Sequence, residues 1–388
     1  MRVLIHMGDS FPNEGPAANR MRVFSETLTE HGHEVTVIAP KSGKWDKTTE
    51  NVRYCPTVTL KKKTSLRRFL NQFVFSFTSV FSSLGTGKAD VVLTTSPPAL
   101  IGISGWIIAK LKRAALVYDV RDIWPDVALE MGKLSERDVM SKIFACVRDF
   151  LLRQADLITT VSPGKVEKLK GYAPRARLRL ITNGLDERFL ENTIQDEIIN
   201  AYGKDENFKC VYIGNLGWAQ GLSQLLDVAK RAKQSGLDAR FYLFGSGVEE
   251  DLLKAYAVKN GLDNVVFAGR IPNASIYTVL HLADMSFVSL VNEKLKDSVP
   301  TKLFEALGAG CPVLLAAAGD SVDILEECGL GIAVYPNDSK ALWEGFLKLY
   351  NDHGEILNKA EQAKRVVLDK YSRQKAAELL ETELQEIL

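Results

Sequence analysis

The chain has 388 residues, more than a single ordinary hydrophobic core holds, so we expect two domains. Apolar residues make up 46% of the sequence and charged residues 25%, a composition that excludes a disordered chain. The formal net charge is +1, which gives no overall attraction to nucleic acid, and we expect no nucleic-acid partner.

Five cysteines are scattered along the chain without the spacing of metal ligands, namely Cys55, Cys146, Cys210, Cys311 and Cys328. Such a pattern is typical of reduced thiols. The first residues become polar too soon for a signal peptide, and the sequence has no uncharged stretch of about 20 apolar residues that would span a membrane. The sequence therefore predicts a cytoplasmic protein.

Short apolar runs alternate with amphipathic helical stretches along the chain. In the first half the predicted strands are Val3–Ile5, Glu34–Ile38, Val91–Thr94, Leu116–Tyr118, Leu157–Val161 and Leu178–Ile181, and the clearest helices are Asn19–Glu30 and Val139–Arg153. After the polar stretch 190–206 the predicted strands are Lys209–Ile213, Arg240–Phe244, Val265–Ala268, Met285–Val288, Val313–Ala316 and Gly331–Val334. This alternation predicts two parallel sheets with helices on both faces.

The expected fold is therefore α/β, with two Rossmann-like domains that face a central cleft. The first domain takes residues 1–190 and the second residues 200–371, and a helix rich in Ala, Leu, Glu and Gln follows at about 372–388. Ligands of such domains bind at the carboxyl ends of the strands, so the loops that follow the strands are candidate sites.

Two carboxylates eight positions apart, Asp297 and Glu305, flank Pro300, Thr301 and Lys302. Pro300 suits the first turn of a helix, so Asp297 lies in the preceding loop and Glu305 about two turns in. A helix N-terminus offers unpaired N–H groups and a positive dipole end, which suit a diphosphate, and Lys302 adds a positive charge. We expect Glu305 to bind a ribose diol and Asp297 to face a sugar. The alternative is an ordinary capped helix with surface acids.

Three turns that follow predicted strands of the second half contain the other candidate ligand-binding residues. They are Gly214, Asn215, Gly217 and Gln220 in the first turn, Gly245 in the second, and Arg270 and Ile271 in the third. Glycines in such turns let the backbone approach a phosphate or sugar closely. The turn with Arg270 and Ile271 resembles a segment that packs beside a nucleotide base, which implies that its backbone groups read the base, and an ordinary surface turn is the alternative.

The segment from Asp297 to Glu305 resembles the acidic-x7-acidic signature of retaining glycosyltransferase family 4, and residues 310–313 resemble that family's turn into the next strand. The resemblance implies the GT-B fold and a UDP-sugar donor bound by the second domain, with no further cofactor. It also implies that the final helix crosses back to the first domain and that Gly15 leans over the donor phosphates. No metal is expected, because no Asp-x-Asp pair follows a strand.

The sequence departs from the family pattern at three positions. Asp297 replaces the usual Glu, and Asn215 and Gln220 stand where the family has an Arg and a Lys for the diphosphate. The positive charge must then come from Lys302, Arg270 or the helix dipole. A subgroup that acts in bacterial surface-polysaccharide synthesis, with fucosaminyltransferase-like and colanic-acid-type enzymes, shares the Gln-Gly and Pro-x-Lys forms.

In the first half, charged residues and a tryptophan gather directly after the strand Leu116–Tyr118. Similar runs are found in the polysaccharide subgroup. Asp122 or Asp119 is placed to orient or deprotonate an acceptor hydroxyl, and Arg121 to hold the leaving phosphate. The alternative is a loop held together by ion pairs of Arg121 with Asp119 or Asp122.

The first loop and helix of the chain carry further candidates. The glycines of the loop from Gly8 to Gly15 lie too far apart for a dinucleotide fingerprint, which disfavours an NAD-dependent dehydrogenase. Arg20 and Arg22, at the start of the next helix, face either the cleft or solvent.

Basic residues run into aromatic residues between Lys61 and Phe81. They are Lys61, Lys62, Lys63, Arg67 and Arg68, followed by Phe69, Phe73, Phe75, Phe77 and Phe81. Phe69, Phe73 and Phe77 recur every four residues and share one helical face. An interfacial helix on anionic lipid fits this pattern, and burial of the phenylalanines in the domain core is the alternative.

The resemblance thus implies a retaining, metal-independent transfer from a UDP-sugar, and the likeness to the polysaccharide subgroup implies that the sugar is N-acetylated or a 6-deoxy amino sugar. The expected acceptor is a polyprenyl-diphosphate-linked saccharide or an oligosaccharide, in O-antigen or capsule synthesis at the cytoplasmic face of the inner membrane. Two alternatives stay open. A UDP-sugar 2-epimerase would interconvert donors without an acceptor, and a non-catalytic sugar-nucleotide-binding protein would bind UDP and release none from a donor.

Overall fold

The computed structural model describes residues 1–9, 11, 15–41, 51–57, 65–203 and 206–388. The chain divides into two compact units. Unit 1 consists of Met1–Asn183 together with Arg373–Leu388, and unit 2 of Gly184–Ser372. Residues 184–190 therefore belong to the second unit, although the sequence placed them in the first domain.

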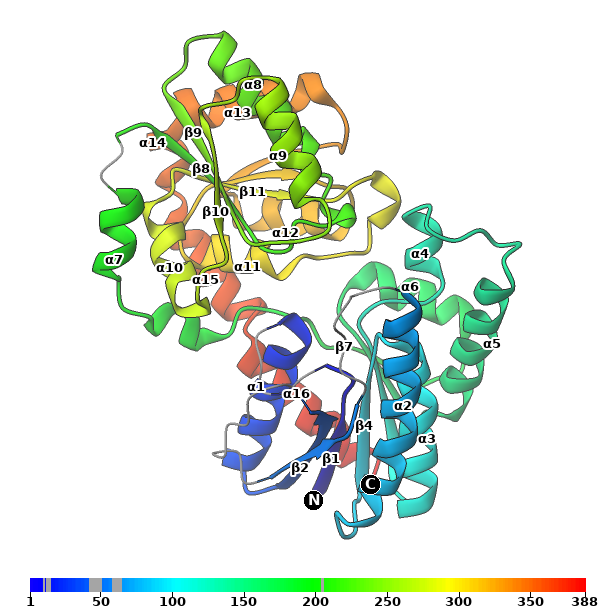
Figure 1. Cartoon of the computed structure of the whole chain (residues 1–388). Coiled ribbons are helices and arrows are strands. Elements are labelled where there is room, and N and C mark those ends of the chain that lie inside the picture. Colours follow the sequence, from blue (N-terminus) through cyan, green and yellow to red (C-terminus); the bar gives the residue numbers. More distant parts are fainter. Residues whose placement is uncertain (10, 12–14, 42–50, 58–64, 204–205) are drawn as a thin grey trace. The chain divides into compact units, whose positions relative to one another are not determined.

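Unit 1 is built on a parallel sheet that has seven strands in the described part of the chain (Figure 1). They are β1 (Arg2–His6), β2 (Glu34–Pro40), β3 (Val52–Cys55), β4 (Val91–Ser96), β5 (Ala115–Val120), β6 (Leu157–Thr160) and β7 (Leu178–Leu180). Their order in the sheet is β3-β2-β1-β4-β5-β6-β7. The order reverses between β1 and β4, as it does in doubly wound folds.

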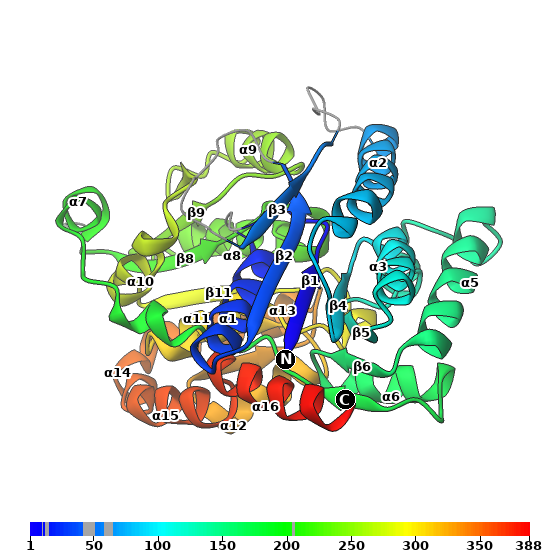
Figure 2. The ribbon, with the colours of Figure 1, turned by 90° about the horizontal axis from the view of Figure 1, so that it is seen from below.

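Helices cover both faces of this sheet (Figure 2). They are α1 (Pro16–Glu30), α2 (Ser65–Leu84), α3 (Ala99–Lys112), α4 (Asp126–Glu130), α5 (Val139–Gln154), α6 (Pro163–Tyr172) and α16 (Arg373–Glu386). Side chains of a strand alternate between its two faces. Val3 and Ile5 of β1 therefore pack with residues of α1 and α16, whereas Leu4 packs with residues of α2 and α3. The last helix thus completes the core of the first unit.

Unit 2 repeats the plan with a six-stranded parallel sheet in its described residues. The strands are β8 (Phe208–Ile213), β9 (Ala239–Phe244), β10 (Val265–Gly269), β11 (Met285–Ser289), β12 (Val313–Ala316) and β13 (Gly331–Val334). The helices are α7 (Asp196–Ile198), α8 (Ser223–Gln234), α9 (Glu250–Lys259), α10 (Asn273–Leu282), α11 (Thr301–Gly308), α12 (Asp320–Cys328), α13 (Ser339–Asn351), α14 (His353–Leu357) and α15 (Ala360–Lys370). Phe241, Phe287 and Phe346 are fully buried in its core.

These two sheets confirm the fold prediction, and each predicted strand lies within two residues of its expected ends. The sequence analysis missed β3, whose four residues include the exposed Arg53 and offer no continuous apolar run. Within the described residues, no helix is both long enough and apolar enough to cross a membrane.

His6 joins β1 to β4 and α2 inside unit 1. Its side chain is fully buried, with Nδ1 3.1 Å from Thr94 Oγ1, Nε2 3.0 Å from Ser79 Oγ, and the ring stacked on Phe75. Burial lowers the pKa of the imidazole to about 3, because the charged form would lose its hydration. His6 is therefore neutral and holds α2 on the sheet through hydrogen bonds.

We expect the free energy of unfolding to decrease as the pH falls from 6.5 towards 3, because the unfolded chain then binds a proton that the folded His6 excludes. The stabilisation is fully present above pH 6.5, since the folded pKa lies below the unfolded value. Urea unfolding at a series of pH values measures it. His6→Gln should flatten this dependence, and His281→Gln, at an exposed position of α10, should keep it. Equal slopes in the wild type and His6→Gln would contradict the assignment.

Candidate functional site

The candidate donor site lies where the strand order of the unit 2 sheet reverses. β8 and β11 are neighbours at the centre, with β9 and β10 on one side and β12 and β13 on the other. Ligands of open parallel sheets bind beyond the carboxyl ends of the strands at such a point. The loops 214–222 and 290–300 follow β8 and β11, and both carry residues that the sequence selects.

These two loops are hydrogen-bonded to each other. Ser289 Oγ donates to the Gln220 carbonyl oxygen (2.5 Å), and the Val291 N–H donates to the Ala219 carbonyl oxygen (2.8 Å). The side-chain Oε1 of Gln220 is buried and has no hydrogen-bond partner among the described residues. Buried polar atoms are normally hydrogen-bonded, so this oxygen is an exception within the loop. Asn215 is exposed, and Gly217 packs within the same loop.

The glycine loops after β8 and β9 pack backbone against backbone. The Gly214 N–H donates to the Phe244 carbonyl oxygen (2.8 Å), and the Gly245 N–H donates to the Gly269 carbonyl oxygen (2.7 Å). A Cβ at Gly245 would lie 1.8 Å from the Gly214 carbonyl oxygen, and a Cβ at Gly247 would lie 2.1 Å from that of Leu216. Both positions therefore require glycine, and the loops present main chain rather than side chains.

Gly245→Ala should lower the free energy of unfolding by about 1–3 kcal/mol, because the new methyl group displaces the β8 loop and the φ of 137° strains an alanine. Gly354→Ala is the matched control, since a Cβ there meets nothing within 4 Å. Urea denaturation of the three proteins measures the difference. Equal stability of the two variants would contradict the close packing of the loops.

Lys302, the second residue of α11, is directed at the β8 loop. Its Nζ donates to Tyr212 Oη (2.7 Å) and lies 3.8 Å from the centroid of the Tyr212 ring. Tyr212 Oη in turn donates to the Asn215 carbonyl oxygen (2.6 Å). Burial lowers the pKa of the Lys302 amine to about 7, and the negative charge of Glu305 acts in the opposite direction. A bound anion would favour the ammonium form.

The sequence analysis did not select Tyr212. The one feature of the sequence that could have indicated it is its position, one residue before the end of the strand and two residues before the first glycine of the loop. The spacing alone does not reveal that its hydroxyl meets a lysine 90 positions further along the chain.

The acidic residues flank the start of α11 as expected. Asp297 is 4% exposed in the preceding loop, and Glu305 is the fifth residue of the helix and half-buried. α11 begins at the half-buried Thr301, with Pro300 at the N-cap position rather than in the first turn. No side chain caps the helix at Pro300 in the described structure, so its N-terminus remains suited to an anion.

Arg270 and Ile271 follow β10 at the edge of this region. Arg270 is exposed, and its Nε donates to Ser246 Oγ (2.6 Å) in the β9 loop. Ile271 is half-buried. The turn after β10 is therefore joined to the glycine loop that precedes α9.

In unit 1, Arg121 ties together three loops at the carboxyl ends of the strands. Its Nε donates to Thr95 Oγ1 (2.9 Å), its Nη2 donates to the Pro97 carbonyl oxygen (2.8 Å), and the same nitrogen lies 3.5 Å from Asp9 Oδ2. Asp122 is half-buried beside it. Gly15 is the N-cap residue of α1.

Asp119 does not lie at an open site, contrary to one of our expectations. Its carboxylate is fully buried, pairs with Arg20 Nη2 (3.0 Å), and accepts hydrogen bonds from Thr95 and Thr159. Burial favours the neutral acid, but the charge and hydrogen bonds of Arg20 outweigh it and lower the pKa of Asp119. The partner of Asp119 is thus Arg20 and not Arg121, and Arg20 faces neither cleft nor solvent.

Arg20 also donates to the carbonyl oxygens of Ile181 (2.8 Å) and Thr182 (2.7 Å) after β7. Arg20→Ala should lower the free energy of unfolding by about 3–5 kcal/mol, because it leaves the Asp119 charge buried and unpaired. The double variant Arg20→Met/Asp119→Leu should lose less than the single one. Urea denaturation measures both, and a double variant less stable than Arg20→Ala would contradict this explanation.

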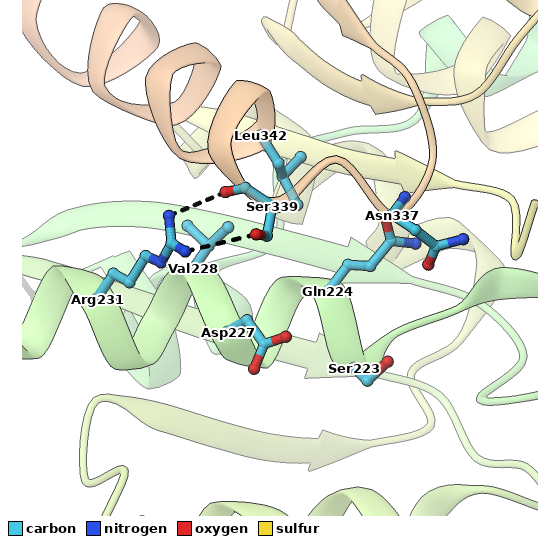
Figure 3. Close-up of a pocket in the computed structure, with 8 residues that line it drawn as sticks. All are labelled: Ser223, Gln224, Asp227, Val228, Arg231, Asn337, Ser339 and Leu342. Carbon is cyan, nitrogen blue, oxygen red and sulfur yellow. Dashed lines mark hydrogen bonds between the residues drawn. The ribbon is translucent and has the colours of Figure 1, made fainter.

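A separate hollow in unit 2 lies between α8 and the start of α13 (Figure 3). Arg231 Nη1 donates to the Ser339 carbonyl oxygen (3.0 Å), and the Asn337 N–H donates to Gln224 Oε1 (2.6 Å). The residues that line it include none of those selected for the donor site. Arg231 and Gln224 are thus hydrogen-bonded within the lining, and we assign the hollow no ligand.

Two family models match the chain and together span both units. "Glycosyl transferase 4-like domain" matches residues 15–184, and "Glycosyl transferases group 1" matches residues 194–373. With the paired sheets and the glycine loops at the switch point, these matches define a glycosyltransferase with the GT-B fold. The model that matches the first half describes a domain like that of glycosyltransferase family 4.

Two curated relatives are similar to the chain in sequence, and a solved structure is similar in fold. The probable glycosyltransferase WbjE of Pseudomonas aeruginosa is 25% identical over 290 residues, which cover 72% of this chain and 71% of WbjE. The putative colanic acid biosynthesis glycosyl transferase WcaI of Escherichia coli K12 is 25% identical over 348 residues, or 82% of this chain and 85% of WcaI. Anabaena HepE in complex with UDP-glucose has a TM-score of 0.76 and 16% identity, with 99% of each chain covered. Both relatives are named as glycosyltransferases.

Proposed function

We propose that this protein transfers a sugar from a UDP-sugar to a saccharide acceptor during bacterial surface-polysaccharide synthesis, with retention of the anomeric configuration and without a metal ion. The observation that carries the proposal is the main-chain cradle of Gly214 and Gly245, with Lys302 directed at it. The names of WcaI and of the HepE complex with UDP-glucose support the pathway and the donor.

The chemistry of transfer explains this arrangement. Negative charge accumulates on the diphosphate as its bond to the sugar breaks, and positive groups that are already oriented lower the barrier. The helix N-terminus at Thr301 and the Lys302 ammonium supply that charge. They take the place of the family's Arg and Lys, where this chain has Asn215 and Gln220. Tyr212 holds the Lys302 amine towards the loop.

The two acidic residues, one before α11 and one within it, are proposed to make the remaining side-chain contacts to the donor. Glu305 binds the ribose hydroxyls, Asp297 binds the transferred sugar, and the backbone near Arg270 and Ile271 reads the uracil. The buried amide of Gln220 is a further partner for a sugar hydroxyl. The donor sugar that we propose is an N-acetylated or 6-deoxy amino sugar.

The acceptor belongs to unit 1, where Asp122 lies in the loop that follows the carboxyl end of β5. Asp122 is the proposed group that orients the acceptor hydroxyl. Asp119 has a structural role and not a catalytic one in this proposal, because its carboxylate is buried in an ion pair with Arg20. The proposed acceptor is a saccharide on polyprenyl diphosphate, in O-antigen or capsule synthesis at the cytoplasmic face of the membrane.

Asp297→Ala and Glu305→Ala should each reduce UDP release from the preferred UDP-sugar at least about 100-fold while the protein stays folded. A screen of UDP-sugars for UDP release, with and without membrane lipid extract, identifies that donor first. Asp263→Ala removes an exposed acid of unit 2 and should leave the rate unchanged. Wild-type rates in Asp297→Ala and Glu305→Ala would overturn the site assignment.

The affinity for UDP should weaken between pH 7 and 9, because the pKa of the Lys302 amine in the free protein is about 7 and UDP binds the ammonium form. Titration calorimetry at several pH values measures the effect. Lys302→Met should bind UDP weakly at every pH in this range, whereas Lys254→Met, at a position on the exposed surface of α9, should keep the wild-type dependence. Tyr212→Phe should weaken UDP binding about tenfold by removing the hydrogen bond that orients Lys302. A pH-independent wild-type affinity would contradict the role of Lys302.

A further inference from the structure

The outer face of α2 carries a row of large apolar side chains that the described structure leaves exposed. We call this row the α2 stripe, and it consists of Leu70, Phe73, Phe77, Phe81 and Leu84, each between 47% and 62% exposed. Its members recur at intervals of three or four residues and therefore share one side of the helix. The rings of Phe77 and Phe81 contact each other, with centroids 4.8 Å apart.

The inner face of the same helix is more polar than the outer one. Phe75, Ser79 and Ser83 are buried against unit 1, and Ser79 is hydrogen-bonded to His6. A helix on the surface of a globular protein normally has the opposite arrangement. Burial in the core, the alternative expected from the sequence, is therefore correct for Phe75 and wrong for Phe73, Phe77 and Phe81. Contiguous exposed apolar surface of this kind is typical of an interaction site.

The charge of the surrounding sequence indicates the kind of partner. Residues 51–89 contain seven basic residues and no acidic one. Two of them, Arg67 and Arg68, belong to the first turn of α2. Lys61–Lys63 lie outside the described residues, as do the side chains of Arg67, Arg68 and Phe69, and the positive charge of the basic residues is known from the sequence alone. A positive segment beside an apolar face complements anionic lipid headgroups.

We propose that the α2 stripe lies on an anionic membrane surface, with the axis of α2 in the plane of the interface and its phenylalanines among the acyl chains. α2 has 20 residues, a length of about 30 Å, but no described helix is apolar enough to cross a bilayer. A second copy of the chain is a poorer partner, because it would bring an equally positive segment to the same contact. The inference deepens the proposed function, since a polyprenyl-linked acceptor resides at such a surface.

Sedimentation of the 388-residue chain with vesicles tests this surface directly. Wild type should bind vesicles of phosphatidylethanolamine with phosphatidylglycerol, and should bind phosphatidylcholine vesicles about tenfold more weakly. Phe73→Glu/Phe77→Glu should reduce binding to the anionic vesicles at least about tenfold. Leu252→Glu/Val258→Glu adds the same charge at exposed apolar positions of α9 and should bind as the wild type does. Arg67→Gln/Arg68→Gln should weaken binding and reduce its dependence on salt.

Three results would overturn the proposal. The first is wild-type vesicle binding by Phe73→Glu/Phe77→Glu, and the second is equal binding of the wild type to both kinds of vesicle. The third is a wild-type dimer that becomes a monomer in Phe73→Glu/Phe77→Glu without any vesicle binding, because the stripe would then join two copies of this chain. Thermal unfolding followed by circular dichroism checks that each variant is folded.

Vesicle binding needs no donor and UDP binding needs no membrane, so the two proposals fail separately. Phe73→Glu/Phe77→Glu should keep the wild-type UDP affinity. Loss of vesicle binding with retained UDP binding supports the surface assignment whatever the reaction proves to be. Lost UDP affinity in Lys302→Met with retained vesicle binding supports the donor site alone.

Discussion

The contact between the Gly214 carbonyl and Gly245 is the constraint on which the donor site depends. With no side chain at either position, the loops after β8 and β9 come close enough to form one continuous main-chain surface. Lys302 is directed at this surface, and the loop after β11 is hydrogen-bonded to it through Val291. Three separate stretches of sequence, namely the loop after β8, the loop after β9 and the segment that runs from the end of β11 into α11, are thereby brought to one end of the unit 2 sheet. The loop after β8 lacks the Arg and Lys with which the family usually binds the diphosphate, and Lys302 of α11 lies beside this loop instead.

The sequence predicted the strands and turns of this region well because their signals are local. Strands that are buried on both faces read as short apolar runs, and a glycine turn followed by a helix is recognisable without any knowledge of its neighbours. The order of the strands, once the sheet is parallel and doubly wound, then places Gly214, Gly245 and Pro300 at the same edge. The hydrogen bond from Lys302 to Tyr212 lay beyond such reasoning, because it depends on how the start of α11 is oriented over β8.

Charged residues near strand ends were harder to interpret. Asp119 and Arg121 are two positions apart, yet Asp119 is fully buried, whereas Arg121 reaches an exposed aspartate. Successive side chains of a strand point to opposite faces of the sheet. The sequence does not reveal which buried carboxylate forms an ion pair with a residue of a distant helix. Arg20 is such a partner, and nothing in its local sequence distinguishes it from the half-exposed Arg22. The α2 stripe was equally ambiguous, because periodicity shows that phenylalanines share a face without showing which face meets the core.

The order in which the chain visits its two units has a consequence for how the protein is made. Unit 2 is continuous in sequence, from Gly184 to Ser372, whereas the core of unit 1 includes Ala377, Leu380 and Leu384 of α16. Arg373, the first residue of that helix, donates to the Asn183 carbonyl oxygen, where the chain left unit 1 (2.7 Å). During synthesis, which proceeds from the N-terminus, the larger part of unit 1 emerges from the ribosome first but must wait for the last residues to close its core. The half of the molecule that is translated second is thus the half that can finish folding first.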